Sequence, residues 1–543
     1  MTNKTKKSSS AIPAKTIILM MAATFLAKFL GMLRGALLSY NYGTSGLSDA
    51  FTTAQNISSS FFDFIFAAAI GGCFIPVYTS FAKNDSADLT GKNTSDEADR
   101  FACVFLNVMI LIAGVMTTIG MIAAKPIVAV IASDMEPELA ALTVTLLRIM
   151  FPIAAFAVGT YTLVGVLQSK NSFLLPALLS AISNAGVILY FLFIDERLGD
   201  NGIYGLAAAY LLSWVVQFLT LAIPLMKMGF KFRLIFDFKN PALIKALKNA
   251  PPILLGSWLM PAGALLGTTF ADKITLVSGT GTIAAFGYAN GLYIMIAGIL
   301  TYSVCNFLFP KLSRLSAENS ISGDDEFKKS VRDGVIGSLS IIIPVMAGVF
   351  ILSGEGVAIL YGRGEFTVSD VETVSKLLSV ITLAMPAFAV AELGSRVFYA
   401  RGMVAPPVIA ALSGVAANAA VTSALIYSGA GDKIGMNAVG FGNAAGQITA
   451  AAVFVIFAHV KIRGIINAHL LIGIGKTCVS SAAAYTAMKI VYGLIGNAGE
   501  YSLSLMKNAV TAVIVFAVGA AVYLALMYCF KSLNRLNRRK EHE

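Results

Sequence analysis

Charged residues are scarce in this sequence: Asp, Glu, Lys and Arg together make up 13% of its 543 residues. A soluble protein carries about 25%, so this chain has too few charges to cover a water-exposed surface. Its hydrophobic residues, 57% of the total, fall in long runs. Strands of an outer-membrane barrel would instead alternate in polarity over about ten residues, and a stretch such as VFLNVMILIAGVMTTIGMIAA (104–124) shows no alternation. The composition therefore predicts a polytopic, all-α membrane protein.

The residues that carry chemistry are also few. The three histidines have no metal-ligand spacing, and the five cysteines are scattered without a CxxC pair, so neither a zinc site nor a disulfide framework is indicated. The nearest string to a phosphate-binding loop is LIGIGKT, but Leu470 occupies its required first glycine position. No Ser-His-Asp or paired-carboxylate arrangement is present. We expect no enzymatic activity, no cofactor and no bound metal.

The apolar runs are long enough to cross a membrane. A bilayer core about 30 Å thick needs roughly 20 apolar residues per helix. Lys28 and Arg34 interrupt the first run and no small-residue cleavage site follows it, so a cleaved signal peptide is not expected. We predict about fourteen spans: 16–42, 50–82, 101–124, 139–168, 173–194, 203–227, 242–270, 280–310, 329–352, 373–400, 405–428, 436–460, 468–494 and 505–531.

Basic residues are unevenly distributed between alternate loops. The net charge is +11, and an excess of Lys and Arg marks the cytoplasmic side. The outer loops of the predicted arrangement hold only Lys125, Arg197, Lys273, Arg363 and Lys433. Both termini are therefore predicted to be cytoplasmic, and nucleic-acid binding is not expected. The inner segments hold Lys4, Lys6, Lys7 and Lys15; Lys227, Lys231, Arg233, Lys239, Lys245 and Lys248; Lys311, Arg314, Lys328, Lys329 and Arg332; and Lys531, Arg535, Arg538, Arg539 and Lys540.

Several landmarks recur 234 residues apart and indicate an internal duplication. The pairs are Pro76 with Pro310, Pro152 with Pro386, and Asn184 with Asn418. Six helices per copy leave both copies in the same orientation, which makes them parallel repeats of the kind found in transporters. The predicted organisation is a basic cytoplasmic tail (1–15), an N-lobe of helices 1–6 (16–232), a C-lobe of helices 7–12 (233–464), helices 13–14 (465–531) and a basic cytoplasmic tail (532–543).

Some charges fall inside the apolar runs. A charged side chain at bilayer depth costs several kcal/mol, so it usually faces a cavity. Arg34, flanked by Gly31 and Gly35, and Lys28 lie within the first run, and a basic cavity indicates an anionic substrate. For Arg148 and Arg396 the alternative is that the side chain extends (snorkels) to the membrane interface. The other charges are Asp49, Asp63, Arg148, Glu392 and Arg396.

The segment AKFLGMLRGALLSYNYGTSGLSDAFTTAQNI…GGCFIPVYTSF (27–81) resembles the opening of the MurJ/MviN lipid II flippases, of the multidrug/oligosaccharidyl-lipid/polysaccharide exporter superfamily. FGYANGL, FLFPKLSRLSA, LYGRGEFTVSD and SRVFYARGMVAPPV extend the resemblance over both lobes. It implies two six-helix lobes around a central cavity, with helices 13 and 14 lining a groove for a lipid tail. The implied activity is alternating-access transfer of undecaprenyl-pyrophosphate-linked muropeptide (lipid II) across the bacterial cytoplasmic membrane.

The chain departs from the family pattern at several positions, which makes it a divergent member. Lys28 stands at the position of the family's first arginine, Arg34 matches the second, and Gly35 replaces the acidic residue that follows. The arginine pair of helix 2 falls on Phe62 and Asp63, and the arginine of helix 8 falls near Asn290 and Gly291. The resemblance and the charge placement together give a candidate substrate-binding set of Arg34, Lys28, Asp49, Asn290 and Arg396.

Other functions remain compatible with these residues. A sister exporter could move another lipid-linked oligosaccharide, and a cation-coupled drug exporter would be expected to keep a membrane carboxylate, for which Asp63 and Glu392 are candidates. A non-transporting scaffold for cell-wall synthesis proteins would be expected to lose its cavity charge, and Arg34 argues against that.

Overall fold

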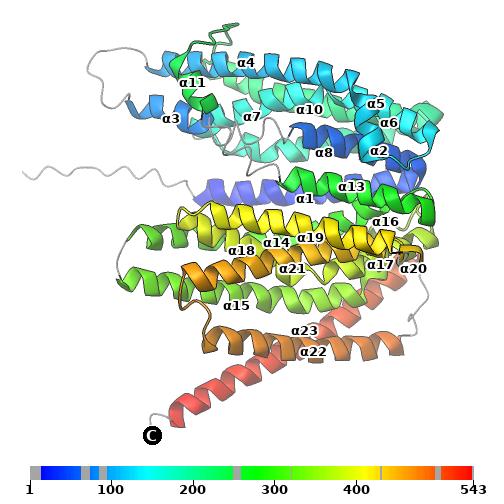
Figure 1. Cartoon of the computed structure of the whole chain (residues 1–543), viewed down its shortest axis with the longest axis vertical. Coiled ribbons are helices and arrows are strands. Elements are labelled where there is room, and N and C mark those ends of the chain that lie inside the picture. The colour runs from blue at the N-terminus through cyan, green and yellow to red at the C-terminus, as the bar shows by residue number, and fades with distance from the viewer. Residues whose placement is uncertain are drawn as a thin grey trace, which may run out of the picture. The chain divides into compact units, whose positions relative to one another are not determined.

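A computed structural model describes residues 14–62, 74–84, 94–170, 172–248, 259–318, 321–428, 431–495 and 503–540. All regular elements in these ranges are helices (Figure 1), which confirms the predicted all-α class. Ten of the described helical segments are long and apolar enough to cross a membrane, or eleven if a bent pair of helices forms one span. The count of fourteen spans stays a prediction. Asp63, a candidate coupling carboxylate, lies outside the described residues.

The chain divides into two compact units, which are described separately. Unit 1 comprises Met1–Leu37, Ala54–Ile127 and Ala141–Pro261; unit 2 comprises Leu38–Thr53, Val128–Ala140 and Ala262–Glu543. Two short segments from the first half of the chain, Leu38–Thr53 and Val128–Ala140, thus belong to the same unit as the second half. The lobe boundaries that the sequence suggested stay a prediction.

Unit 1 is built around an aromatic core. Phe74, Phe101 and Phe105 are completely or almost completely buried, and the ring centroids of Phe74 and Phe105 lie 4.8 Å apart. Helices that contribute to this unit are α1 (Ala14–Tyr42), α2 (Gly46–Phe62), α3 (Ile75–Asn84), α4 (Thr94–Ile122), α5 (Ala124–Ile131), α6 (Pro137–Met150), α7 (Ile153–Ser169), α8 (Leu174–Phe193), α9 (Asp195–Leu198), α10 (Gly202–Lys227) and α11 (Pro241–Lys248), with the short 3₁₀ helix η3 (Gly199–Asn201) before α10.

Unit 2 holds the remaining helices, and small residues bring two of them close together. A Cβ atom on Gly414 of α19 would lie 2.9 Å from the carbonyl oxygen of Gly446 on α21, so only glycine fits at this contact. These helices are α13 (Leu259–Ser278), α14 (Thr282–Ala317), α15 (Ile321–Ile351), α16 (Ser353–Tyr361), α17 (Val368–Thr382), α18 (Met385–Ala400), α19 (Ala405–Tyr427), α20 (Gly431–Ile434), α21 (Asn437–Lys461), α22 (Ala468–Leu494) and α23 (Leu505–Lys540).

The order of helices in the first half of the chain recurs in the second. The series from α4 to α10 (long, short, medium, medium, long, short, long) is repeated from α15 to α21. Pro152 immediately precedes α7, and Pro386 lies in the first turn of α18. Proline has no N–H to donate to the preceding turn, so both copies break at the same place, and the second bends there by 49°. This order supports the duplication inferred from the 234-residue offset.

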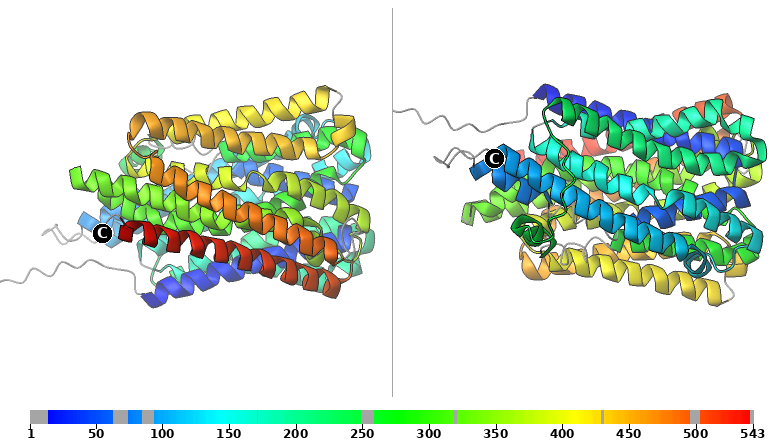
Figure 2. Two further views of the ribbon diagram at one scale, coloured as in Figure 1. Left: turned by 90° about the horizontal axis from the view of Figure 1, so that it is seen from below. Right: turned by 90° about the horizontal axis from the view of Figure 1, so that it is seen from above.

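The two C-terminal helices pack against α15 (Figure 2). Their shared core includes Ala347, Met488 and Val515. The hydroxyl of Tyr523 on α23 donates to the carbonyl oxygen of Ser340 on α15 at 2.6 Å. Ser340 also shares a 3.0 Å hydrogen bond with Thr477 on α22. Interhelical hydrogen bonds of this kind stabilise helix association in a bilayer, so α22 and α23 are held to unit 2 in a defined register.

Candidate functional site

Arg34 lies against an aromatic ring in unit 1. Its guanidinium carbon is 5.2 Å from the ring centroid of Tyr210 on α10, a cation–π contact. The Tyr210 hydroxyl accepts a 2.9 Å hydrogen bond from the side-chain amide of Gln55 on α2. Arg34 is half-buried, and none of the salt bridges found among the described residues involves it. The ring restrains one face of the guanidinium and leaves its N–H edge able to bind an anion.

A polar face of α10 continues from this contact. Tyr210, Ser213 and Gln217 are spaced three and four residues apart, so they lie on one side of the helix. The hydroxyls of Ser213 and Ser183 on α8 lie 3.1 Å apart. The side-chain nitrogen of Gln217 is buried without a hydrogen-bond partner in the described structure. Such groups are costly in a membrane-spanning helix, which makes this face of α10 a candidate polar path.

Lys28 is more exposed than Arg34. The two residues are six apart on α1, which places them about 240° out of phase on an ideal helix. The structure thus gives them different surroundings: Arg34 lies against Tyr210, whereas Lys28 lies on the exposed side of the helix. A substrate role for Lys28 stays a prediction.

Asp49 is buried in unit 2, where it caps a helix. Its side chain is 3% exposed, and its two carboxylate oxygens accept hydrogen bonds from the backbone N–H groups of Gly281 (2.6 Å) and Ala284 (2.7 Å). These groups belong to the first turn of α14, whose N-terminus favours a negative charge. Gly281 has a φ of +95°, and a Cβ there would lie 2.0 Å from the carbonyl oxygen of Thr44, so only glycine permits this approach. The substrate-binding role predicted for Asp49 remains untested.

Three further polar contacts join the segments 38–53 and 128–140 to the second half of the chain. The hydroxyl of Thr44 donates to the carboxylate of Asp370 at the start of α17. Lys273 on α13 forms a salt bridge with Asp134 at 3.0 Å, and the backbone N–H of Asp134 donates to the buried carboxylate of Asp272 at 2.9 Å. By the predicted topology these residues all lie toward the outer side of the membrane.

A polar cavity of about 310 Å³ lies beside these contacts, entirely within unit 2. Six hydroxyl groups line it, together with one lysine and one carboxylate. The lining residues are Thr44, Ser278, Thr280, Gly281, Thr282, Ala285, Ser369, Asp370, Thr373, Lys376, Ile434, Met436 and Asn437.

The last two predicted residues are also in unit 2. Arg396 on α18 faces Glu392 at 3.8 Å, one turn earlier on the same helix. Tyr302 of α14 packs against Phe388, which lies one turn before Glu392 on α18. Asn290 is half-buried on α14, twelve residues before Tyr302, or about 18 Å along the helix. The structure therefore pairs Arg396 with a carboxylate and places Asn290 at a different level of α14.

Sequence reasoning missed Tyr210, which contacts Arg34, and Gln55, which bonds to Tyr210. It placed Lys273 in an outer loop but did not pair it with Asp134. Tyrosine and glutamine are unremarkable in membrane helices, and no motif links them to Arg34. The only available signal was the polar spacing along α10, where Tyr210 begins a series with Ser213 and Gln217.

Comparison with known proteins places this geometry in a family. The sequence model of the family described as "Lipid II flippase MurJ" matches residues 38–511. A probable lipid II flippase MurJ of Rickettsia prowazekii is 24% identical over 535 residues, covering 96% of this chain and 99% of that protein. One from Bdellovibrio bacteriovorus is 25% identical over 415 residues, 76% of each chain.

Solved structures agree on the fold. The structure of a lipid II flippase MurJ in an inward closed conformation matches with a TM-score of 0.75 and 20% identity, over 94% of this chain and 98% of that one. An inward-facing multidrug transporter of the MATE family matches with a TM-score of 0.62 and 15% identity, over 82% of this chain and 98% of that one. Because the family match spans most of the sequence, the chain belongs to the lipid II flippase MurJ family of membrane transporters.

Proposed function

We propose that this protein is a flippase that moves lipid II, the undecaprenyl-pyrophosphate-linked peptidoglycan precursor, across the bacterial cytoplasmic membrane. The observation that carries the proposal is Arg34, a cation restrained by the Tyr210 ring at bilayer depth, in a chain of this family. A guanidinium fits two phosphate oxygens at once, so it suits the pyrophosphate that links the lipid to the sugar. Lys28, Asn290 and Arg396 are the further groups that we propose for the headgroup.

The transport step needs the outer side to open and close. Asp49, Thr44 and Asp134 bind α14, α17 and α13 through side-chain hydrogen bonds and one salt bridge. We propose that these contacts hold the outer side closed while the substrate enters from the cytoplasm, and that they separate when it leaves. The hydroxyl-lined cavity beside them is then the first part of the exit to become accessible.

A second candidate is export of another lipid-linked oligosaccharide. It is favoured by the loss of the family's arginines at Phe62 and near Asn290, which reduces the positive charge available to a pyrophosphate. A cation-coupled drug exporter is less favoured, because Glu392 lies near Arg396 and a paired carboxylate is less available to a coupling ion. Cell-wall synthesis proteins are further candidate partners.

Complementation of a flippase-depleted bacterium tests the proposal directly. We expect the full chain to restore growth and cell shape, and purified protein in vesicles to expose fluorescent lipid II to an outside reductant. A lipid with the same undecaprenyl chain and pyrophosphate but another sugar is the matched control. Equal transfer of both lipids would favour the second candidate, and transfer of neither by folded protein would contradict flippase activity.

A further inference from the structure

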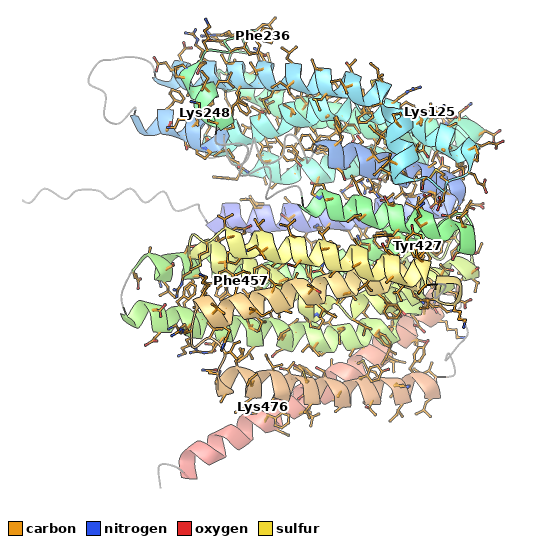
Figure 3. The ribbon with its side chains drawn as sticks, viewed as in Figure 1. Lys125, Phe236, Lys248, Tyr427, Phe457 and Lys476 are labelled. Carbon is orange, nitrogen blue, oxygen red and sulfur yellow. The ribbon has the colours of Figure 1, made fainter. Side chains whose placement is uncertain are left out.

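An extended segment of unit 1 presents apolar side chains on its outer side. After α10 ends at Lys227, the chain runs without a helix to α11 at Pro241. Phe232, Leu234, Phe236 and Phe238 alternate along it and are 39%, 84%, 48% and 58% exposed. Alternation with period two places them on one face of an extended chain. Figure 3 shows Phe236 at the edge of unit 1, beyond α4.

The other face of this segment is fixed to α4. The side-chain amide of Asn107 donates to the carbonyl oxygens of Arg233 (2.8 Å) and Ile235 (3.2 Å). Arg233 reaches Asp96, nearer the start of α4, with a shortest N···O distance of 2.7 Å. Phe230 is buried in the core and Ile235 packs against it. The exposed apolar side chains are therefore held outward by a defined backbone rather than by a loose loop.

The contacts also set the depth of the segment in the membrane. The predicted span of α4 begins at residue 101, and Asn107 lies six residues further, or about 9 Å inside. The headgroup region of each leaflet is roughly 5–8 Å thick. The carbonyls of Arg233 and Ile235, bonded at the level of Asn107, thus lie beneath the headgroups, in the outer part of the acyl-chain region. Leu234, between them, is at the depth where an exposed leucine is stable in lipid.

Helix α11 continues the same surface. It runs across the direction of α4 (Figure 1) and is seen almost end-on in the right-hand view of Figure 2. Leu243 and Ala246 are buried in the core of unit 1, whereas Ile244 and Leu247 are each 38% exposed. A short helix with one face on the protein and an apolar second face, lying across the spanning helices, is suited to the membrane interface.

Positive charge surrounds these apolar residues. Five lysines in residues 227–248 are exposed, and the structure shows no salt bridge from them to a described residue. The only acidic side chain between 228 and 248 is Asp237, whose carboxylate accepts from the backbone N–H of Lys239. Lysines at an interface extend their ammonium groups toward lipid headgroups. The five are Lys227, Lys231, Lys239, Lys245 and Lys248.

We propose that residues 228–248, with Lys227, form an interfacial lipid-binding surface that holds anionic phospholipid. Phe232, Leu234, Phe236 and Phe238 enter the acyl-chain boundary, and the lysines bind the phosphate groups. The inner leaflet is the source of this lipid, because the positive-inside pattern places the segment on the cytoplasmic side. The surface anchors unit 1 at the interface through lipids distinct from the transported one.

Depth-dependent quenching tests the apolar half of the proposal. The full chain, with its native cysteines replaced, carries one fluorophore at Leu234→Cys, or at Phe236→Cys as a second site, in phosphatidylcholine vesicles. We expect quenching by nitroxides near the glycerol end of the acyl chain and protection from aqueous iodide. Asp200→Cys, exposed on the 3₁₀ helix η3 before α10, is the matched water-facing control. Iodide quenching at Leu234 and Phe236 equal to that at Asp200 would overturn the proposal and leave the face free for a protein partner.

Lipid enrichment tests the charged half. A lysine near an anionic surface contributes about fivefold to association, so the triple change Lys231→Gln, Lys239→Gln and Lys245→Gln should lower the phosphatidylglycerol retained by the purified protein roughly tenfold or more. The matched control removes the same charge at exposed lysines elsewhere: Lys125, Lys433 and Lys507. Equal retention by the two variants would overturn anionic-lipid binding, even with Leu234 buried in lipid.

Discussion

The carboxylate of Asp49 offers the sharpest test of how the outer side stays closed. It accepts two backbone hydrogen bonds at 2.6 and 2.7 Å from the first turn of α14. A hydrogen bond to a charged group is worth about 1.5–3 kcal/mol, and two bonds to one group are less than additive. We therefore expect Asp49→Ala to destabilise the closed arrangement by about 2–4 kcal/mol, or roughly 30- to 700-fold in its equilibrium. Asp49→Asn keeps one acceptor oxygen and should lose about half of this free energy.

A buried residue beside Asp49 provides the assay. Ala285 lines the polar cavity and is 1% exposed, so a cysteine there reacts with a membrane-impermeant maleimide only when the outer side opens. Labelling of Ala285→Cys from outside intact cells should be fastest with Asp49→Ala, intermediate with Asp49→Asn and slowest in the parent. Asn467→Ala is the control, because Asn467 caps α22 through a 3.0 Å bond to the backbone N–H of Leu470 and should lower stability without opening the cavity.

The result that would refute this reasoning is specific. If folded Asp49→Ala protein is labelled at Ala285→Cys no faster than the parent, the cap does not hold the outer side closed. Binding of lipid II separates the two roles of Asp49. Loss of transport with unchanged lipid II affinity supports a role in closure, whereas a matching loss of affinity supports the substrate-binding role that the sequence suggested.

Three further predictions concern the substrate, the packing and the topology. Arg34→Ala should reduce lipid II transfer roughly tenfold or more at matched expression, and Arg34→Lys should recover part of it; unchanged transfer would mean that Arg34 only anchors α1. Gly446→Leu should separate α19 from α21 and lower the free energy of unfolding by about 1–3 kcal/mol, measured by thermal unfolding in detergent, whereas Gly475→Ala, with open space around it, should not. A tag near Lys92 should be inaccessible from outside intact cells and one near Asn497 accessible; both positions lie outside the described residues, and the reverse result would invert the topology.

The helical fold could be predicted because the bilayer imposes one requirement on every span. Apolar runs of sufficient length must become helices, since lipid offers no partner for backbone N–H and C=O groups. The internal breaks could not be predicted in the same way. The sequence predicts one span over 139–168, and the structure has one candidate span there, Pro137–Ser169. It divides that span into two helices, because α6 ends at Met150 and α7 begins at Ile153. Hydropathy averages over a run, whereas Pro152 acts locally by removing one N–H.

The candidate site was predicted only one residue at a time. Arg34 is identifiable from the sequence because a charge in an apolar run is unusual, but its partner Tyr210 lies on another helix, and only packing brings the two together. For Asp49, too, the sequence does not show which group the side chain contacts. Its carboxylate bonds to Gly281, 232 residues away, and a backbone N–H leaves no signature in the sequence.

The two copies of the repeat share an ion pair, at the end predicted to be cytoplasmic, that the 234-residue offset did not identify. In unit 1, Lys170 at the end of α7 forms a 3.2 Å salt bridge with Asp99 on α4. In unit 2, Arg401 at the end of α18 binds Asp324 on α15, and its guanidinium lies 4.3 Å from the ring centroid of Phe327. The helices correspond in order, although the residue spacing differs.

The difference in residue spacing shows which features the two copies share. The helices that the ion pair joins correspond, whereas the positions of its residues do not. In each copy the ion pair joins the same two helices at the same end. Any cation and carboxylate that meet there can form this pair. The pair is therefore present in both copies although its residues lie at different positions. Asn184 and Asn418 are held more strictly, because each lies against a glycine on a neighbouring helix, Gly31 and Gly446, where little else fits. A charge that binds substrate does not also have to hold helices together, so it is not required in both copies. A substrate with one pyrophosphate needs its cations on one side only, which is consistent with Arg34 having no basic counterpart 234 residues later, where Thr268 is buried.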